Sequence, residues 1–167
     1  MTEYCHYVSI LSNGTIMGKA RLSPSGVATT ELILEVFRVN GLLLVAGDRL
    51  TKDLGLTSAR WRVMGALAEG PLTAAQIARN MGLKRQSVQR LVNVLSEQSL
   101  ASFSDNPDHR NARLVQLTEM GRNKFEQTSQ IQANWVNSLS EGLELTNLKL
   151  AFEQLRDIEE RLNKSPQ

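Results

Sequence analysis

The chain has 167 residues, enough for one domain or one domain with an appendage. Apolar residues make up 41% and charged residues 22%, an ordinary globular composition that excludes disorder as the general state. No run approaches the roughly 18 apolar residues of a membrane span, and the N-terminus lacks the basic start and apolar run of a secretory signal. We therefore expect a cytoplasmic protein with no membrane partner.

Cysteine and histidine are scarce. The single cysteine, Cys5, cannot form an internal disulfide, and two histidines, His6 and His109, argue against a zinc site built by the protein. We expect neither metal nor cofactor. The net charge is only +2, but residues 79–122 hold seven basic and four acidic residues. A basic central segment between neutral or acidic arms favours a polyanionic partner.

We expect four parts in chain order. Residues 1–28 contain the turn-like run Ser23-Pro24-Ser25-Gly26 and no sustained periodicity, so they are interpreted as a loosely ordered extension, with Met17 as an alternative first residue. Residues 29–56 form an N-terminal helix. Residues 57–118 form a compact middle lobe, and residues 119–167 form two C-terminal helices.

The N-terminal helix is predicted from Thr30 to about Lys52. Its apolar residues recur at spacings of three and four: Leu32, Val36, Val39, Leu43, Ala46 and Leu50. A second set, Ile33, Phe37 and Leu44, widens the stripe. Such a helix packs against two partners, and Gly55 ends it.

The middle lobe opens with a helix that Thr57 would cap and that Gly70-Pro71 would close. Leu72 offers a very short extended piece. Thr73 and Gln76 form a capping-box pattern, which predicts a short helix over 73–81. A longer helix follows over about 84–98.

Two strand-like runs, 101–104 and 112–117, end the middle lobe. The loop between them is polar apart from one proline, and the second run alternates apolar with polar residues. These features predict an antiparallel hairpin.

The short and long helices match a helix-turn-helix. Ala78, Gly82 and Val88 fall at relative positions one, five and eleven. That unit needs a small residue where the helices approach, a glycine for a left-handed turn, and a branched apolar residue to hold the second helix.

The outward face of the second helix favours duplex DNA. It is polar or basic, with Glu97 alone acidic at its far end. Its residues include types that hydrogen-bond base edges and phosphates. No aromatic residue lies between Leu72 and Ala101, which disfavours a stacking platform for single strands. The residues of this face are Lys84, Arg85, Gln86, Ser87, Gln89, Arg90 and Asn93.

Specific motifs follow one another along the middle lobe. They are the run from Thr73 to Ala78, the triplet Met81-Gly82-Leu83, the run from Gln86 to Val92, and the wing signature Asp108-x-Arg110-x-x-Arg113 with Leu117-Thr118-x-x-Gly121 after it. Together they resemble the MarR family of bacterial winged-helix regulators. The resemblance covers about 30–162. Lys84 stands where the family often has a Ser or Thr cap, and the segment before Ala28 has no counterpart.

The resemblance implies a mainly α fold with a small β-hairpin wing, a winged helix-turn-helix with long N- and C-terminal dimerisation helices. It implies a homodimer that binds a pseudopalindromic operator, usually as a repressor. The apolar stripes of both C-terminal helices also favour a dimer. Together with the N-terminal helix, these helices present more apolar surface than one small lobe can cover. The DNA-binding residues are then Thr73, Lys84, Arg85, Gln86, Ser87, Gln89, Arg90, Asn93, Asp108, Arg110 and Arg113.

We assign separate roles in the wing. Arg110, near the tip, is expected to enter the minor groove, where negative potential attracts a guanidinium. Asp108 is expected to hold Arg110 or a neighbouring arginine, because a carboxylate facing phosphates would be repelled. Arg113 either braces the hairpin or meets a phosphate.

The sequence also bears on three other classes of function. We expect no enzyme, since the sequence lacks a nucleotide-binding loop, a serine elbow and enough histidines. A winged-helix module that binds a protein partner, and an oxidant sensor that uses Cys5, stay open as alternatives. The resemblance also implies a small aromatic effector, which Phe37, Trp61, Arg62 and Trp135 could contact.

Overall fold

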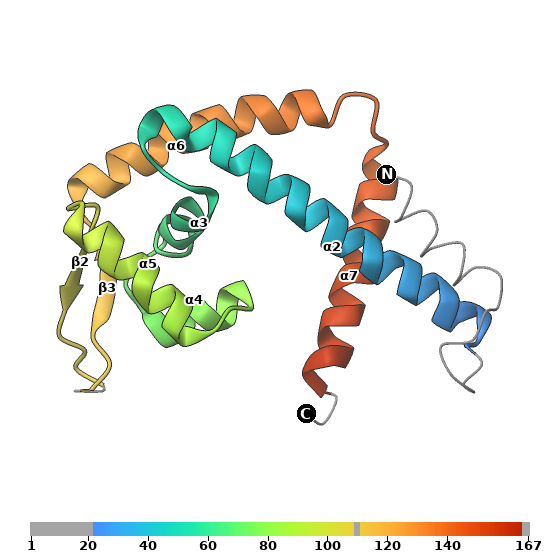
Figure 1. Cartoon of the computed structure of the whole chain (residues 1–167), viewed down its shortest axis with the longest axis horizontal. Coiled ribbons are helices and arrows are strands. Elements are labelled where there is room, and N and C mark those ends of the chain that lie inside the picture. Colours follow the sequence, from blue (N-terminus) through green and yellow to red (C-terminus); the bar gives the residue numbers. More distant parts are fainter. Residues whose placement is uncertain (1–21, 109–110, 165–167) are drawn as a thin grey trace. The chain divides into compact units, whose positions relative to one another are not determined.

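The computed structural model of the chain describes residues 22–108 and 111–164 (Figure 1). It divides into two compact units, Met1–Phe125 and Glu126–Gln167. Within the described ranges, no helix is long and apolar enough to cross a membrane. The fold class expected from the sequence, mainly α with a small β-hairpin wing, is confirmed.

Helices and short strands follow in the expected order. They are α2 (Pro24–Thr51), the 3-10 turn η1 (Lys52–Leu54), α3 (Ser58–Ala66), β1 (Leu72–Thr73), α4 (Ala74–Met81), α5 (Arg85–Glu97), β2 (Ala101–Ser104), β3 (Leu114–Leu117), α6 (Glu119–Leu139) and α7 (Leu145–Lys164).

The first helix begins earlier than expected. Placing residues 24–28 in a loose extension is wrong, because Ser23 caps α2 and its Oγ accepts the Gly26 N–H at 3.0 Å. Pro24 occupies the first turn, where its fixed φ suits a helix and its missing N–H is not needed. The run with the composition of a turn is therefore a helix start.

The end of α2 is tied closely to the start of α3. Gly47 is buried, and a Cβ there would lie 2.7 Å from the Ser58 Cβ. The neighbouring Asp48 accepts the Ser58 N–H with its Oδ1 at 2.7 Å, while Thr57 caps α3 with its own side chain as expected. The missing side chain at position 47 lets the helices approach.

The helix-turn-helix has the local chemistry that the sequence indicated. Thr73 and Gln76 form the complete capping box of α4. Gly82 follows with a left-handed φ of 63°, and Val88 is fully buried at the start of α5. Lys84 lies at the N-cap of α5 without a side-chain capping hydrogen bond, so the departure from Ser or Thr leaves this start uncapped by a side chain.

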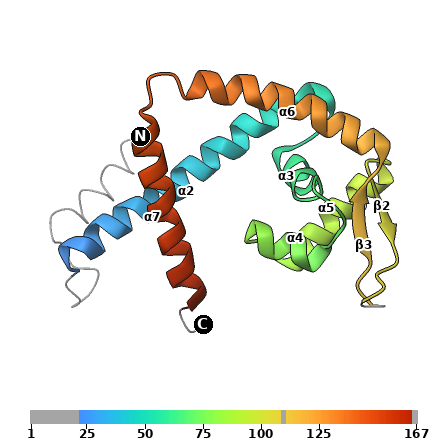
Figure 2. The same cartoon turned by 180° about the vertical axis from the view of Figure 1, so that it is seen from behind.

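The wing is part of a three-stranded antiparallel sheet. The strand order is β1-β3-β2, with Leu72 opposite Val115 and Phe103 opposite Val115 on its other side. Both views show β2 and β3 projecting as a hairpin beside α5 (Figures 1 and 2). The second run of the hairpin begins at Leu114 rather than Ala112, and the short piece at Leu72 forms the third strand.

The helices and strands of the middle lobe enclose one apolar core. Its fully buried side chains include Met64 from α3, Ile77 from α4, and Val92 and Leu95 from α5. The β-strands add Ala101, Val115 and Leu117. The helices α4 and α5 and the strands that carry the wing loop are therefore anchored on the same core.

A close backbone contact fixes the start of α6. Thr118 Oγ1 accepts the Gly121 N–H at 3.0 Å and donates to the Ser99 carbonyl oxygen at 2.7 Å. The Thr118 N–H donates to the Leu100 carbonyl oxygen, and a Cβ on Gly121 would lie 1.9 Å from that same oxygen. The Leu-Thr-x-x-Gly motif thus holds the start of α6 against the short connection between α5 and β2.

The second unit contains the remainder of α6 and α7. Gly142, with a φ of 80°, lies between them in the left-handed region that glycine tolerates. The two C-terminal helices expected within 119–167 are therefore separated at this glycine, and the second of them begins at Leu145.

Candidate nucleic-acid interface

The outer face of α5 presents amides, hydroxyls and guanidinium groups. Arg85, Gln86, Ser87, Arg90 and Asn93 are exposed, and Gln89 is half-buried. The opposite face, Val88, Val92 and Leu95, lies in the core. The polar residues therefore face outward because the helix buries a narrow apolar stripe.

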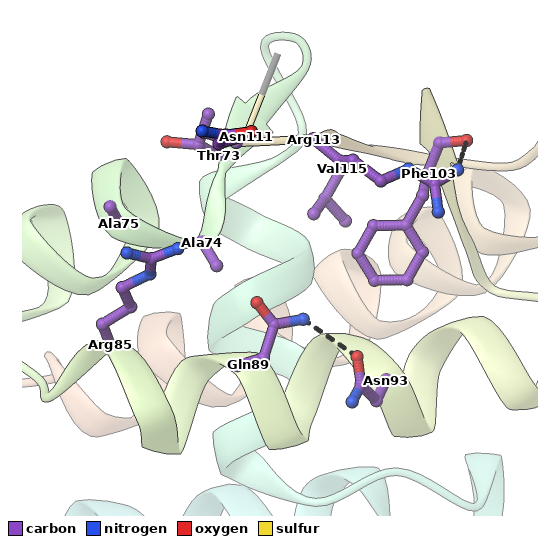
Figure 3. A pocket seen from close by; sticks show the side chains of 11 residues that line it. Thr73, Ala74, Ala75, Arg85, Gln89, Asn93, Phe103, Asn111, Arg113 and Val115 are labelled. Atoms are coloured by element: carbon purple, nitrogen blue, oxygen red, sulfur yellow. Dashed lines mark hydrogen bonds between the residues drawn. The ribbon is translucent and has the colours of Figure 1, made fainter. Parts of the chain in front are cut away.

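A pocket of about 400 Å³ lies where α5, the start of α4 and the wing meet (Figure 3). Thr73 lines it from the end of β1, Arg85 and Gln89 from α5, and Phe103 and Arg113 from the wing. The fold thus gathers residues that the sequence listed separately. Two of the five side chains carry a positive charge, which suits an anionic ligand such as a nucleic-acid backbone.

Arg113 is held against the wing by two contacts. Its guanidinium carbon lies 5.2 Å from the centre of the Phe103 ring, and its Nη2 donates to the Phe103 carbonyl oxygen at 3.3 Å. Cation–π attraction and a hydrogen bond both fix the side chain across the hairpin. These contacts support the brace, one of the two roles considered for Arg113.

Asn106 is a wing residue that the sequence interpretation missed. Its Nδ2 donates to the Ala112 carbonyl oxygen at 2.9 Å, and its Oδ1 accepts the Asp108 N–H at 3.0 Å. One amide therefore closes the base of the loop and starts its turn. The Asn106-Pro107 pair carried the signal, since Asn side chains commonly initiate turns in this way.

Some expected contacts are not yet placed. Arg110 and His109, like Cys5, fall outside the described residues, so the pairing of Asp108 with Arg110 stays a prediction. Asp108 itself is exposed. Thr73 is half-buried, and its hydroxyl is engaged with Gln76 in the capping box, which leaves it at the pocket wall as a cap of α4.

The four residues expected to contact an aromatic effector lie on three helices. Phe37 on α2 is 69% exposed, Trp61 and Arg62 follow one another on α3, and Trp135 lies on α6 in the second unit. Trp61 and Trp135 are half-buried, and Arg62 is exposed. The pocket between α5 and the wing is lined by other residues.

Most of the middle lobe matches the model of a known protein family. Residues 54–110 match the model of the MarR family. An uncharacterised protein of Mycobacterium tuberculosis is 34% identical over 125 residues, covering 75% of this chain and 87% of that protein. The transcriptional activatory protein BadR of Rhodopseudomonas palustris is 24% identical, covering 69% and 71%, and the HTH-type transcriptional repressor IacR of Pseudomonas putida is 25% identical, covering 64% of each.

Solved structures agree in fold. The transcriptional regulator BldR from Sulfolobus solfataricus superimposes with a TM-score of 0.73 at 19% identity, covering 80% of this chain and 96% of that one. CouR from Rhodococcus jostii, solved with p-coumaroyl-CoA bound, gives 0.70 at 23% identity, covering 78% and 92%. MarR proteins are transcription regulators rather than enzymes. The chain belongs to the MarR family and is a DNA-binding winged helix-turn-helix transcription regulator.

Proposed function

We propose that the chain binds a pseudopalindromic duplex operator as a homodimer, with α5 in the major groove and the wing at the adjacent minor groove. The observation that carries this proposal is the outer face of α5, where exposed Arg85 and Arg90 flank uncharged hydrogen-bonding side chains. A helix of this kind suits the major groove, which admits an α-helix and exposes base-specific donors and acceptors.

Each part of the surface has its own role. Gln86, Ser87, Gln89 and Arg90 contact base edges, with Asn93 beside them on the same helix face, while Lys84 and Arg85 at the start of α5 contact phosphates. Thr73 caps α4 and holds its start beside the DNA backbone. In the wing, Arg110 enters the minor groove and Asp108 holds an arginine.

Exposed apolar faces on two helices support the dimer. On α2, Phe37, Leu42 and Val45 are at least half exposed. In α7, whose residues are all described, none is buried, and Phe152 is 62% exposed. Large apolar side chains left exposed along two helices favour an interaction site, and a second copy of the same helices offers a matching surface. We place the dimerisation region in 29–56 and 119–167, and the DNA-binding lobe in 57–118.

Sedimentation velocity at micromolar concentration tests the assembly. We expect a dimer for the full chain, and aggregates or monomers after truncation before Leu145. A monomeric full chain contradicts the proposed dimer.

Fluorescence anisotropy on labelled duplexes tests the interface. Arg85→Ala and Arg90→Ala should weaken binding to a duplex selected from a random pool. Arg49→Ala removes the same charge from the exposed end of α2, outside the DNA-binding lobe, and serves as the control when sedimentation shows the same assembly as for the parent. Equal affinity of all three variants and the parent would remove α5 from the interface and favour a protein partner.

Repression and release by an aromatic ligand complete the proposal. Repression follows if the operator overlaps a promoter, and a promoter–reporter fusion checks its sign. Benzoate and p-coumarate serve as probes of the ligand, because the two tryptophans, Trp61 and Trp135, report nearby binding by fluorescence. We expect quenching together with loss of DNA affinity, and Phe37→Ala or Arg62→Ala should weaken both. Probes that change neither signal contradict release by these aromatic acids.

A further inference from the structure

Two neighbouring side chains on α5 are joined by a hydrogen bond that orients one of them. Gln89 Nε2 donates to Asn93 Oδ1 at 2.9 Å, one helical turn further along. In Figure 3 the Gln89 carbonyl oxygen is turned away from Asn93, and Gln89 lines the pocket between α5 and the wing. This hydrogen bond joins the two carboxamides, so that the Nε2 of Gln89 lies toward Asn93 and its Oε1 lies away from it.

This orientation leaves a defined polar edge on Gln89. A carboxamide has one acceptor oxygen and two N–H donors, and Asn93 takes one of those donors. The Oε1 acceptor and the second N–H remain available on the same carboxamide. They form a pair in which an acceptor and a donor stand side by side.

That pair complements adenine in the major groove. Adenine presents the N6 amino donor next to the N7 acceptor, whereas guanine presents two acceptors, O6 and N7. Guanine would therefore bring O6 against Gln89 Oε1. The arginines of the same pocket, Arg85 and Arg113, have donors only and cannot accept the adenine amino group.

We infer that Gln89 reads an adenine in each half-site of the bound duplex and that Asn93 is the positioning residue that orients its carboxamide. The inference rests on the proposed function, because it requires α5 to lie in the major groove. It adds the identity of one recognised base and the residue that sets the specificity there.

Selection from a randomised duplex pool tests the base. The parent should select a motif with an adenine at one position of each half-site. Gln89→Ala should lose about 5- to 150-fold of that preference, the equivalent of one bidentate contact, and should keep the other positions. Gln86→Ala is the matched control, since it removes another α5 glutamine and should alter a different position.

The role of Asn93 is tested by coupling. Asn93→Ala should weaken the preference at the position that Gln89→Ala affects, because the carboxamide becomes free to rotate. The double variant should lose no more there than Gln89→Ala alone. Independent changes at two separate positions would overturn the positioning role.

A modified base keeps the test independent of whether the variants fold. Replacing the selected adenine by 7-deazaadenine removes the N7 acceptor but retains base pairing. The parent should bind this duplex more weakly than the unmodified one, and Gln89→Ala should bind both equally. Equal binding by the parent, or a Gln89→Ala motif identical to that of the parent, overturns the inference alone. A parent chain that retains no duplex from the pool overturns the proposed function as well.

Discussion

The guanidinium of Arg113 packs over the ring of Phe103, 5.2 Å from its centre, and also donates to the Phe103 carbonyl oxygen. Phe103 lies in β2 and pairs with Val115 of β3, and Arg113 directly precedes β3 on the other arm of the hairpin. The wing arginine of the family signature therefore has a partner within its own hairpin. These contacts join the two arms of the wing, and we expect DNA binding to depend on the shape that they hold.

The brace predicts that Arg113 and Phe103 act together. Phe103→Leu keeps an apolar side chain but removes the ring, and we expect it to weaken DNA binding about as much as Arg113→Ala. Loss of the cation–π contact should lower the free energy of unfolding by about 0.5–1 kcal/mol. Phe103→Leu should also lose part of the packing of the half-buried ring against the core. Anisotropy titrations of both single variants and the double variant check this.

A phosphate role for Arg113 would give another pattern. Arg113→Ala alone would then reduce the salt dependence of binding by about one counterion, while Phe103→Leu would leave it unchanged. Additive losses in the double variant would contradict the brace.

A side chain at position 121 should disrupt the start of α6. The Cβ of Gly121→Ala would lie 1.9 Å from the Leu100 carbonyl oxygen, a backbone atom that cannot rotate away. We expect the free energy of unfolding to fall by about 1–3 kcal/mol or more, measured by urea denaturation. In the control Gly65→Ala, the nearest atom outside the helix backbone is Phe125 Cε2 at 3.6 Å, an ordinary contact, so little loss is expected.

The link between Asp48 and Ser58 should appear in the pH dependence of stability. The hydrogen bond from the Ser58 backbone N–H lowers the pKa of the Asp48 carboxyl below its ordinary value of 3.8. A carboxyl with a lowered folded-state pKa stabilises the fold above about pH 4, and this contribution disappears as pH falls through the lowered value. Urea midpoints between pH 3 and 7 should show it.

Two variants separate the causes of this pH dependence. Asp48→Asn should lose part of it, since an amide does not titrate. Ser58→Ala keeps the backbone donor and should retain most of it. Identical profiles for the parent and Asp48→Asn would contradict the proposed link.

Substitutions in α5 and at the wing tip should have different effects on DNA binding. Gln86→Ala should change which bases are selected, at about 1–3 kcal/mol for a lost bidentate contact. Arg110→Ala should weaken binding to every duplex and reduce the salt dependence by about one counterion, with a larger effect on A·T-rich flanks. Titrations against several duplexes at three salt concentrations distinguish them, and an unchanged affinity for Arg110→Ala would remove the wing tip from the interface.

Residue type and spacing along the chain are enough to predict the local structure of the lobe. The Thr73 and Gln76 capping box, the left-handed turn at Gly82 and the polar face of α5 all depend on residues within one or two helical turns. Interactions at that range are set by residue type and spacing, so a pattern predicts them. The start of α2 was misread because Ser23 and Pro24 are common both in turns and in the first turn of a helix.

Contacts between residues far apart in the sequence depend instead on the tertiary structure. Sequence alone predicted neither the Asp48 carboxylate at the start of α3 nor the approach of Gly121 to the Leu100 carbonyl oxygen. Asn106 closing the wing and Arg113 over Phe103 depend equally on strand register. Such contacts join residues six to more than twenty positions apart. They are fixed by how one shared core orients every element around it, and the spacing of residues along the chain carries no record of that orientation.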